Sequence, residues 1–199
     1  MPKIVNHEER RQLLSEAAWR VIAREGIDNV TVRKIAGESG YSPGTLAHYF
    51  TDKDAILRSA LERADDNIRQ RIEAMPDDLA PLESLRRVLC EALPLDEERS
   101  FELTLDVNFW ARALNQPTLR TMQHVDHDEW RSRVMERVES AKDAGEFPAH
   151  TSVEDLADLL VAFVDGIGLQ ALIYPELVTA ERVTHLLDHQ IKLMTGATP

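Results

Sequence analysis

Residues 31–56 read TVRKIAGESGYSPGTLAHYFTDKDAI, and this stretch predicts two short helices joined by a tight turn. Thr31 is a suitable N-cap for a first helix that ends at Gly40, because a threonine oxygen accepts a free backbone N–H and a glycine tolerates positive φ. Ser42 is expected to cap the second helix, and Pro43 fits its first turn, where no N–H is needed. The apolar residues of each helix fall on one face. The pattern is that of a helix-turn-helix.

A helix-turn-helix inserts the start of its second helix into the major groove of DNA. Gly44 would let the backbone come close to a phosphate or a base. We predict that Thr45 and His48 face the groove, while the cationic and phenolic side chains lie near phosphates. The predicted DNA-binding residues are Thr31, Arg33, Ser42, Pro43, Gly44, Thr45, His48, Tyr49 and Lys53.

The same stretch resembles a known family. The agreeing positions are Thr31, Arg33, Ile35, Ala36, Gly40, the run SPGTL at 42–46, the run HYF at 48–50 and Lys53. Together they resemble the N-terminal signature of the TetR family of bacterial transcriptional repressors, from about Glu9 to Leu61. Ala47 departs from it, because the family most often has there a tyrosine that touches the DNA backbone. The resemblance implies that His48 and Tyr49 compensate for that contact.

Length and composition predict an all-α fold. The chain has 199 residues, of which 43% are hydrophobic and eight are glycine, so it can bury a sizeable core. Apolar periodicity predicts about nine helices: an N-terminal three-helix helix-turn-helix head and a larger helical body. We expect a DNA-binding domain at 1–56, a linking helix from about 52 to 74, and an effector-binding and dimerisation domain at 75–199. The break MPDD at 75–78 is the expected hinge.

The charge is divided unevenly along the chain. The net charge is −12, but residues 1–58 hold nine Lys and Arg against eight acids, so the head carries +1 and the remainder −13. An acidic body would repel DNA and orient the head toward it; the same charge is equally consistent with a role in solubility alone. Cys90 is the only cysteine, which excludes an intrachain disulfide and favours a reducing cytoplasm. It is expected to be a small buried residue.

No targeting or membrane segment is predicted. The N-terminal residues MPKIVNHEERR lack the apolar core of a signal peptide. The most apolar segment, 156–174, is interrupted by Asp158, Asp165 and Gln170, so it is expected to be a buried helix and not a membrane span.

The last two expected helices suggest a homodimer. They cover residues 151–174, with Thr151 as the expected N-cap, and 179–194, and they carry more apolar surface than a small monomer easily hides. A two-fold protein would match a palindromic DNA site. The alternative is that these helices form an ordinary single-chain core. The predicted dimer-interface residues are Leu160, Val164, Gly168, Ala171, Leu187 and Ile191.

The helices expected between 96 and 145 suggest an effector cavity. Their aromatic residues lie near a carboxylate, Asp106, and aromatic faces with a carboxylate suit a cation, so an amine or quaternary ammonium is predicted. The alternative is that the aromatic residues only pack in the core and Asp106 faces solvent. The predicted ligand-binding residues are Asp106, Phe109, Trp110, Met122, Trp130, Phe163 and Ile167.

The C-terminal half also shows a resemblance. The runs NFWARALNQPTLR at 108–120, AGEFPA at 144–149 and DGIGLQALI at 165–173 resemble the TetR-family subgroup that includes the choline-responsive repressor of betaine synthesis, over roughly Leu103 to Met194. The subgroup has diverse effectors, so the resemblance implies the scaffold and the dimer face.

No pattern indicates catalysis. His124 and His127 stand at i, i+3, but a structural zinc site usually has four ligands with Cys among them, so a polar helix face is the simpler interpretation. No Ser-His-acid order, phosphate loop or HExxH occurs, and we predict no enzyme, no metal and no cofactor. The predicted function is a ligand-responsive homodimeric transcriptional regulator, a repressor that binds double-stranded operator DNA and is released by a small-molecule effector. The alternative is an all-α small-molecule binding protein or enzyme without DNA-binding activity.

Overall fold

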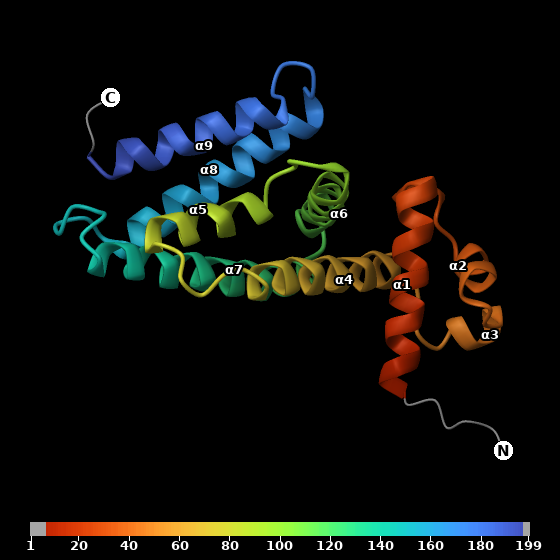
Figure 1. The fold of residues 1–199 in the computed structure, drawn as a ribbon. Coiled ribbons are helices and arrows are strands. Elements are labelled where there is room, and N and C mark those ends of the chain that lie inside the picture. Colours follow the sequence, from red (N-terminus) through yellow and green to blue (C-terminus); the bar gives the residue numbers. More distant parts are fainter. Residues whose placement is uncertain (1–6, 197–199) are drawn as a thin grey trace. The chain divides into compact units, whose positions relative to one another are not determined.

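The computed structural model describes residues 7–196. The regular secondary structure of these residues is entirely helical, without a strand (Figure 1). The elements are α1 His7–Glu25, the 3-10 turn η1 Ile27–Asn29, α2 Val32–Ser39, α3 Pro43–Leu46, α4 Lys53–Glu73, α5 Pro81–Glu91, α6 Glu97–Ala113, α7 Pro117–Asp143, α8 Val153–Ile173 and α9 Ala180–Met194. The predicted all-α fold with about nine helices is confirmed.

The chain divides into two compact units, residues 1–69 and 70–199. The division falls within α4, whose residues 53–69 belong to the first unit and 70–73 to the second. The sequence prediction instead began the second domain at residue 75, after this helix.

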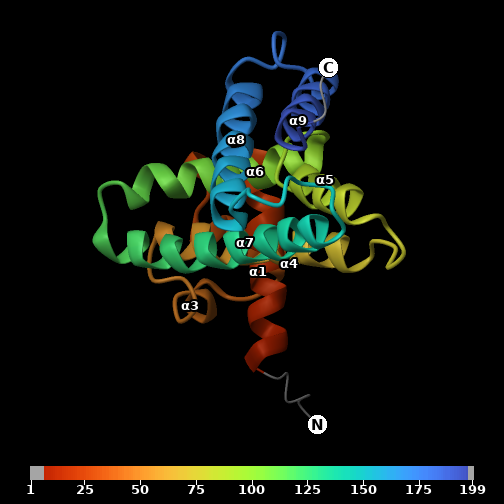
Figure 2. The same ribbon diagram turned by 90° about the vertical axis from the view of Figure 1, so that its left-hand side faces the viewer.

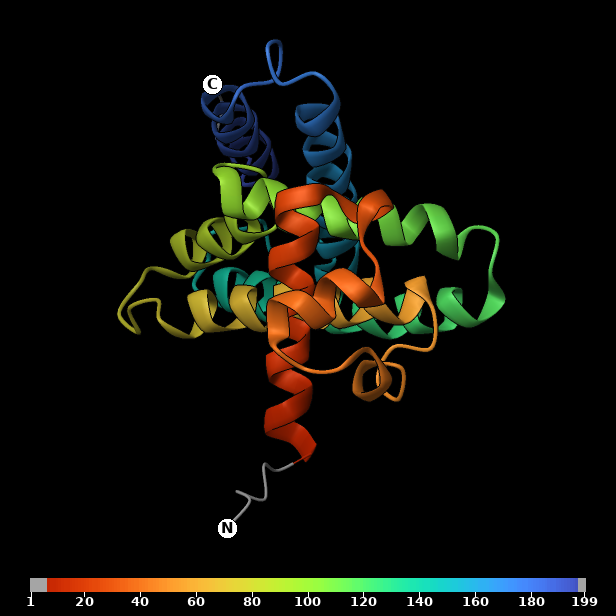
Figure 3. The ribbon, with the colours of Figure 1, turned by 90° about the vertical axis from the view of Figure 1, so that its right-hand side faces the viewer.

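The first unit is built around the helix-turn-helix (Figure 3). α1 packs against α2, and α2 against α3. Thr31 accepts the Lys34 N–H and caps α2, while Gly40 ends it with φ 73°. Leu46 and Phe50 are buried, and hydrogen bonds from the Tyr49 and Phe50 N–H groups to the Leu46 carbonyl continue the turn beyond α3. Because each of these contacts is local, the unit follows the sequence pattern closely.

The second unit is a helical body made by α5 to α9. α6 and α7 are neighbours joined by residues 114–116, and α8 and α9 lie side by side (Figure 2). α5, α7, α8 and α9 share one apolar core, to which α8 contributes the face of Leu160, Val164 and Ile167. α6 also packs against α8: a Cβ added at Gly168 would lie 2.8 Å from the Leu103 Cδ2 atom. Gly168 therefore permits a close approach between helices of one chain.

α8 begins one residue later than predicted, and it is largely apolar. The N-cap is Ser152, which accepts the Asp155 N–H, so the expected cap at Thr151 was wrong by one residue. α8 is long and apolar enough to cross a membrane, with a mean hydropathy of 1.8. Its inward face is nevertheless buried against α6, α7 and α9, as in the core helix of a globular domain.

Candidate nucleic-acid interface and effector domain

The predicted DNA-binding residues lie at the start of α2, on α3, in the turn that follows it and at the start of α4. Their exposure differs: Thr31, Arg33, Ser42, Pro43, Gly44 and His48 are exposed, and Thr45, Tyr49 and Lys53 are half-buried. Ser42 Oγ accepts the Thr45 N–H at 3.1 Å and lies 2.9 Å from Thr45 Oγ1. This hydroxyl pair holds the Thr45 side chain in place at the exposed end of α3.

Lys53 has a second role besides its predicted phosphate contact. Its Nζ donates a hydrogen bond to the Asp28 carbonyl oxygen at 2.9 Å and lies 3.5 Å from the Asp28 carboxylate. An ammonium has three donors, so this bond leaves others for a phosphate. Lys53 thus also ties the start of α4 to η1.

Salt bridges between α1 and α2 brace the helix-turn-helix. Glu38 of α2 accepts from Arg24 at 3.0 Å and from Arg20 at 2.9 Å, and these two guanidinium groups lower the pKa of Glu38. Lys34 pairs with Glu25 at 2.6 Å and lowers the pKa of that carboxyl. These pairs are exposed, so each contributes little stability by itself. They use the positive charge of Arg20, Arg24 and Lys34 within the protein.

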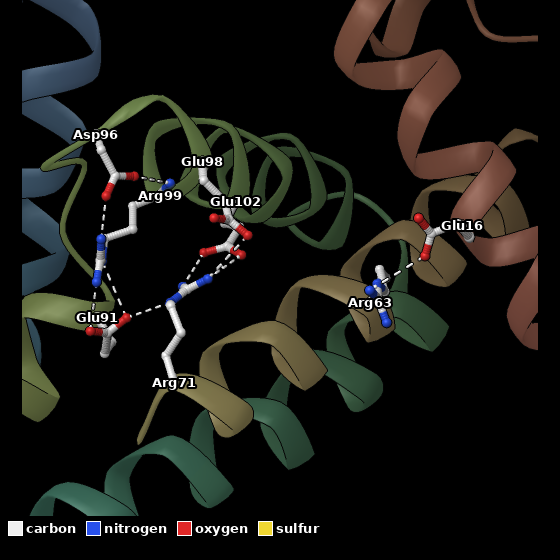
Figure 4. Close-up of polar contacts among 8 residues, drawn as sticks. All are labelled: Glu16, Arg63, Arg71, Glu91, Asp96, Glu98, Arg99 and Glu102. Carbon is white, nitrogen blue, oxygen red and sulfur yellow. Dashed lines mark hydrogen bonds and ion pairs between the residues drawn. The ribbon is translucent and has the colours of Figure 1, made fainter. Parts of the chain in front are cut away.

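A buried ionic cluster lies in the second unit, where the last turn of α4 meets α5 and α6 (Figure 4). Arg71 donates to Glu91 at 2.6 Å and to Glu102 at 3.0 Å, and hydrogen bonding to Glu102, then to Glu91, raises the pKa of Arg71 further. Glu102 is 2% exposed and Glu91 is 7% exposed. Arg99 donates to Glu91 at 2.7 Å and also pairs with Asp96. Both buried carboxylates are therefore neutralised by arginine.

The predicted ligand-binding residues occupy different environments. Ile167 belongs to the core shared by α5, α7, α8 and α9, with Trp130 and Phe163 packed against it. Phe109 is fully buried, whereas Met122 is 39% exposed. The packing of these aromatic residues agrees with the alternative that they are core residues.

Two further predicted positions bear on polar recognition in the second unit. Asp106 is half-buried and has an interaction partner, so the carboxylate is not simply directed into solvent. Trp110 Nε1 is buried and has no hydrogen-bond acceptor among the described residues. A groove on the outer side of α7, bordered by Val125 and Glu136, includes none of the predicted ligand-binding residues.

Asp165 is a polar residue that the sequence prediction did not include in the effector site. It lies on the apolar helix α8, and burial raises the pKa of its carboxyl, while the charge of His127 on α7 lowers it. The carboxylate forms no hydrogen bond or ion pair within the described part of the chain. Its position as an acid inside an apolar run was the available sequence signal, but the run was used only to argue against a membrane span.

Comparisons with known families agree with these two units. Residues 14–60 match the family of bacterial regulatory proteins of the tetR type, and residues 81–196 match the C-terminal domain of the BetI-type transcriptional repressors. The chain belongs to the TetR family of transcriptional regulators. The family resemblance inferred from the sequence is thereby confirmed.

Full-length relatives support the assignment. This TetR-family regulator is 30% identical to the HTH-type transcriptional regulator PksA of Bacillus subtilis, over 96% of its own length and 93% of the relative. A transcriptional regulator from Rhodococcus sp. Rha1 has a similar structure, with a TM-score of 0.77, 29% identity, and coverage of 95% of this chain and 99% of that one. A regulator from Saccharomonospora viridis, solved in complex with choline, gives a TM-score of 0.77 at 26% identity, with 94% and 97% covered.

The structure places the predicted dimer-interface residues of the regulator in the interior of a single chain. All six are buried within one chain: Leu160, Val164, Gly168, Ala171, Leu187 and Ile191. They form the single-chain core because the most apolar face of α8 packs against the helices of its own body. The opposite face of α8 is exposed: Leu159 is 58% and Ile173 is 56% exposed.

Proposed function

We propose that this regulator is a ligand-responsive repressor that binds palindromic operator DNA as a homodimer and dissociates when a small cationic effector occupies its second unit. The observation that carries the proposal is the helix-turn-helix, in which the capped start of α3 is exposed, as are Arg33 and His48. Two copies would read half-sites about 34 Å apart on one side of the duplex. The single Cys90 thiol and the DNA target suit a cytoplasmic protein.

The proposed dimer uses the exposed face of α8. Leu159, Ala162, Gly166 and Ile173 recur at helical spacing on this face, opposite to the buried one. A Cβ added at Gly166 would meet no atom within 4 Å, so a partner helix has room to approach there. Burying one exposed leucine or isoleucine side chain stabilises an interface by about 1.5–3 kcal/mol, and a symmetric contact doubles the number of such residues.

The proposed effector is an organic cation. Asp165 supports this, because a half-buried carboxylate without a hydrogen-bond or ion-pair partner among the described residues gains from an ion that neutralises it. Trp110 and Trp130 lie on α6 and α7, which both pack against α8, and an aromatic face next to a desolvated cation adds cation–π attraction worth about 2 kcal/mol. The relative solved with choline, at 26% identity, is consistent with this chemical class.

The first experiment asks whether the protein binds DNA selectively. Purified protein is mixed with sheared genomic DNA, the retained fragments are sequenced, and the enriched fragment is tested in a gel shift over a range of salt concentrations. We expect a palindromic fragment whose affinity falls steeply with salt. If no duplex is retained, the repressor assignment is wrong, and a small-molecule binding protein without DNA-binding activity becomes the better proposal.

The second experiment tests the charge of the effector. Choline is compared with 3,3-dimethylbutan-1-ol, which has the same shape but carbon in place of the charged nitrogen. We expect choline to raise the melting temperature and release the DNA, the alcohol to do neither, and Asp165→Asn to remove the difference. Equal responses to both compounds, or release by anions alone, would exclude the cationic effector and leave DNA binding untouched.

A further inference from the structure

The positive charges of the first unit differ in whether an acid already neutralises them. Arg11 pairs with Glu62, Arg63 with Glu16, and the cations on α1 and α2 that face Glu25 and Glu38 are paired as well. Among the described residues of this unit, Arg10 and Arg33 are the cations without a carboxylate partner. Arg33 was predicted as a DNA contact from the sequence, whereas Arg10 was not.

Arg10 is held beside the turn of the helix-turn-helix. Its guanidinium carbon lies 5.7 Å from the centroid of the Tyr41 ring. Tyr41 stands between Gly40, which ends α2, and Ser42, which caps α3. The cation is therefore positioned next to the residues that are predicted to meet DNA, although it comes from α1 at the other end of the unit's sequence.

The environment of Arg10 indicates which of its N–H groups can donate to a ligand. Arg10 Nε is buried and has no acceptor among the described residues, so this donor is not free to reach outward. The two terminal nitrogens of the guanidinium carry further N–H groups, and a planar guanidinium can donate a pair of them to two oxygens of one acceptor. Phosphate offers such a pair of oxygens, and a phosphate would supply the negative charge that Arg10 lacks among the described residues.

We infer that Arg10 is a phosphate-binding residue of the DNA interface, and that the Tyr41 ring holds its guanidinium in place for this contact. The inference rests on the proposed binding of duplex DNA by the first unit. The Arg10 contact comes from α1 and adds to those from α2 and α3, so that the DNA backbone is held at a third point. Since the contact is to phosphate, it strengthens binding to every sequence alike.

The test measures the salt dependence of binding to a duplex of about 30 base pairs with an arbitrary sequence, by fluorescence anisotropy. Each phosphate contact changes the slope of log affinity against log salt by about 0.9. Over a fourfold rise in salt, the affinity of the wild type should therefore fall about 3.5-fold more per chain than the affinity of Arg10→Ala. Arg10→Lys keeps the charge and should keep the slope. Arg11→Ala is the matched control, because its cation is already paired with Glu62, and its slope should equal that of the wild type.

The ring is tested separately. Tyr41→Phe should bind as the wild type does, and Tyr41→Leu should lose affinity because the guanidinium is no longer held. Thermal melts of the same variants show whether folding is retained. If Arg10 only clamps α1 to the turn, Arg10→Ala will lower the melting temperature and leave the salt slope unchanged, which overturns the inference. If the wild type binds no duplex at all, the proposed DNA binding itself is wrong, and Arg10 has no such role.

Discussion

Replacing Arg71 by methionine should destabilise the second unit strongly, because this guanidinium neutralises two buried acids (Figure 4). Glu102 is 2% exposed and pairs with Arg71, and Glu91 pairs with both Arg71 and Arg99. Removing one member of a buried pair costs about 3–5 kcal/mol. Since one of the two acids stays paired, we expect the lower value, about 3 kcal/mol, which lowers the melting temperature of a protein of this size by about 6–12 °C.

The assay is urea denaturation followed by tryptophan fluorescence, because Trp110 and Trp130 lie in the second unit. The matched control is Arg69→Ala on the same helix, whose partner Asp66 is 53% exposed, and it should change stability by less than about 1 kcal/mol.

A second substitution tests the cause of the Arg71 effect. Adding Glu102→Gln to Arg71→Met removes the buried negative charge that has lost its arginine and should recover about 2 kcal/mol. The reasoning is refuted if Arg71→Met is no less stable than Arg69→Ala, or if Glu102→Gln destabilises the double variant further.

Three other predictions concern the dimer, the half-buried Asp165 and the recognition of the DNA sequence. Gly166→Glu should convert the dimer to a folded monomer in sedimentation. Gly168→Glu should instead lose its helical circular dichroism, because the new side chain would enter the core beside Leu103. A folded monomer from Gly168→Glu would contradict the burial of that face. Asp165→Asn should raise the melting temperature at neutral pH, because a carboxyl whose pKa is raised in the folded state destabilises the fold when it is ionised. The gain should disappear as pH falls below about 3.8, where the acid is protonated in both the folded and the unfolded state. A gain that persists at low pH would exclude ionisation as the cause. Thr45→Ala should weaken the preferred operator more than an arbitrary duplex in gel shifts, and an equal loss on both would mean that Thr45 contacts only the backbone.

The helix-turn-helix was predictable because its determinants are local. Thr31, Gly40 and Ser42 act on backbone groups within four residues of themselves, so their spacing in the sequence is sufficient to place two helices and a turn. The one-residue error at the start of α8 has a related origin, since Thr151 and Ser152 are both good capping residues and the sequence does not rank them.

The sequence by itself determined the fold class, the approximate helix boundaries and the family, because capping, helical periodicity and turn chemistry are properties of short segments. Only the tertiary structure decided which side of α8 faces its own core. Gly166 and Gly168 are two residues apart and lie on nearly opposite sides of the helix, but α8 is apolar almost all round, so its pattern contains little directional information. The pairing of Arg71 with Glu102 and the stacking of Arg10 on Tyr41 likewise join residues about 30 apart, and such contacts exist only once the helices have packed.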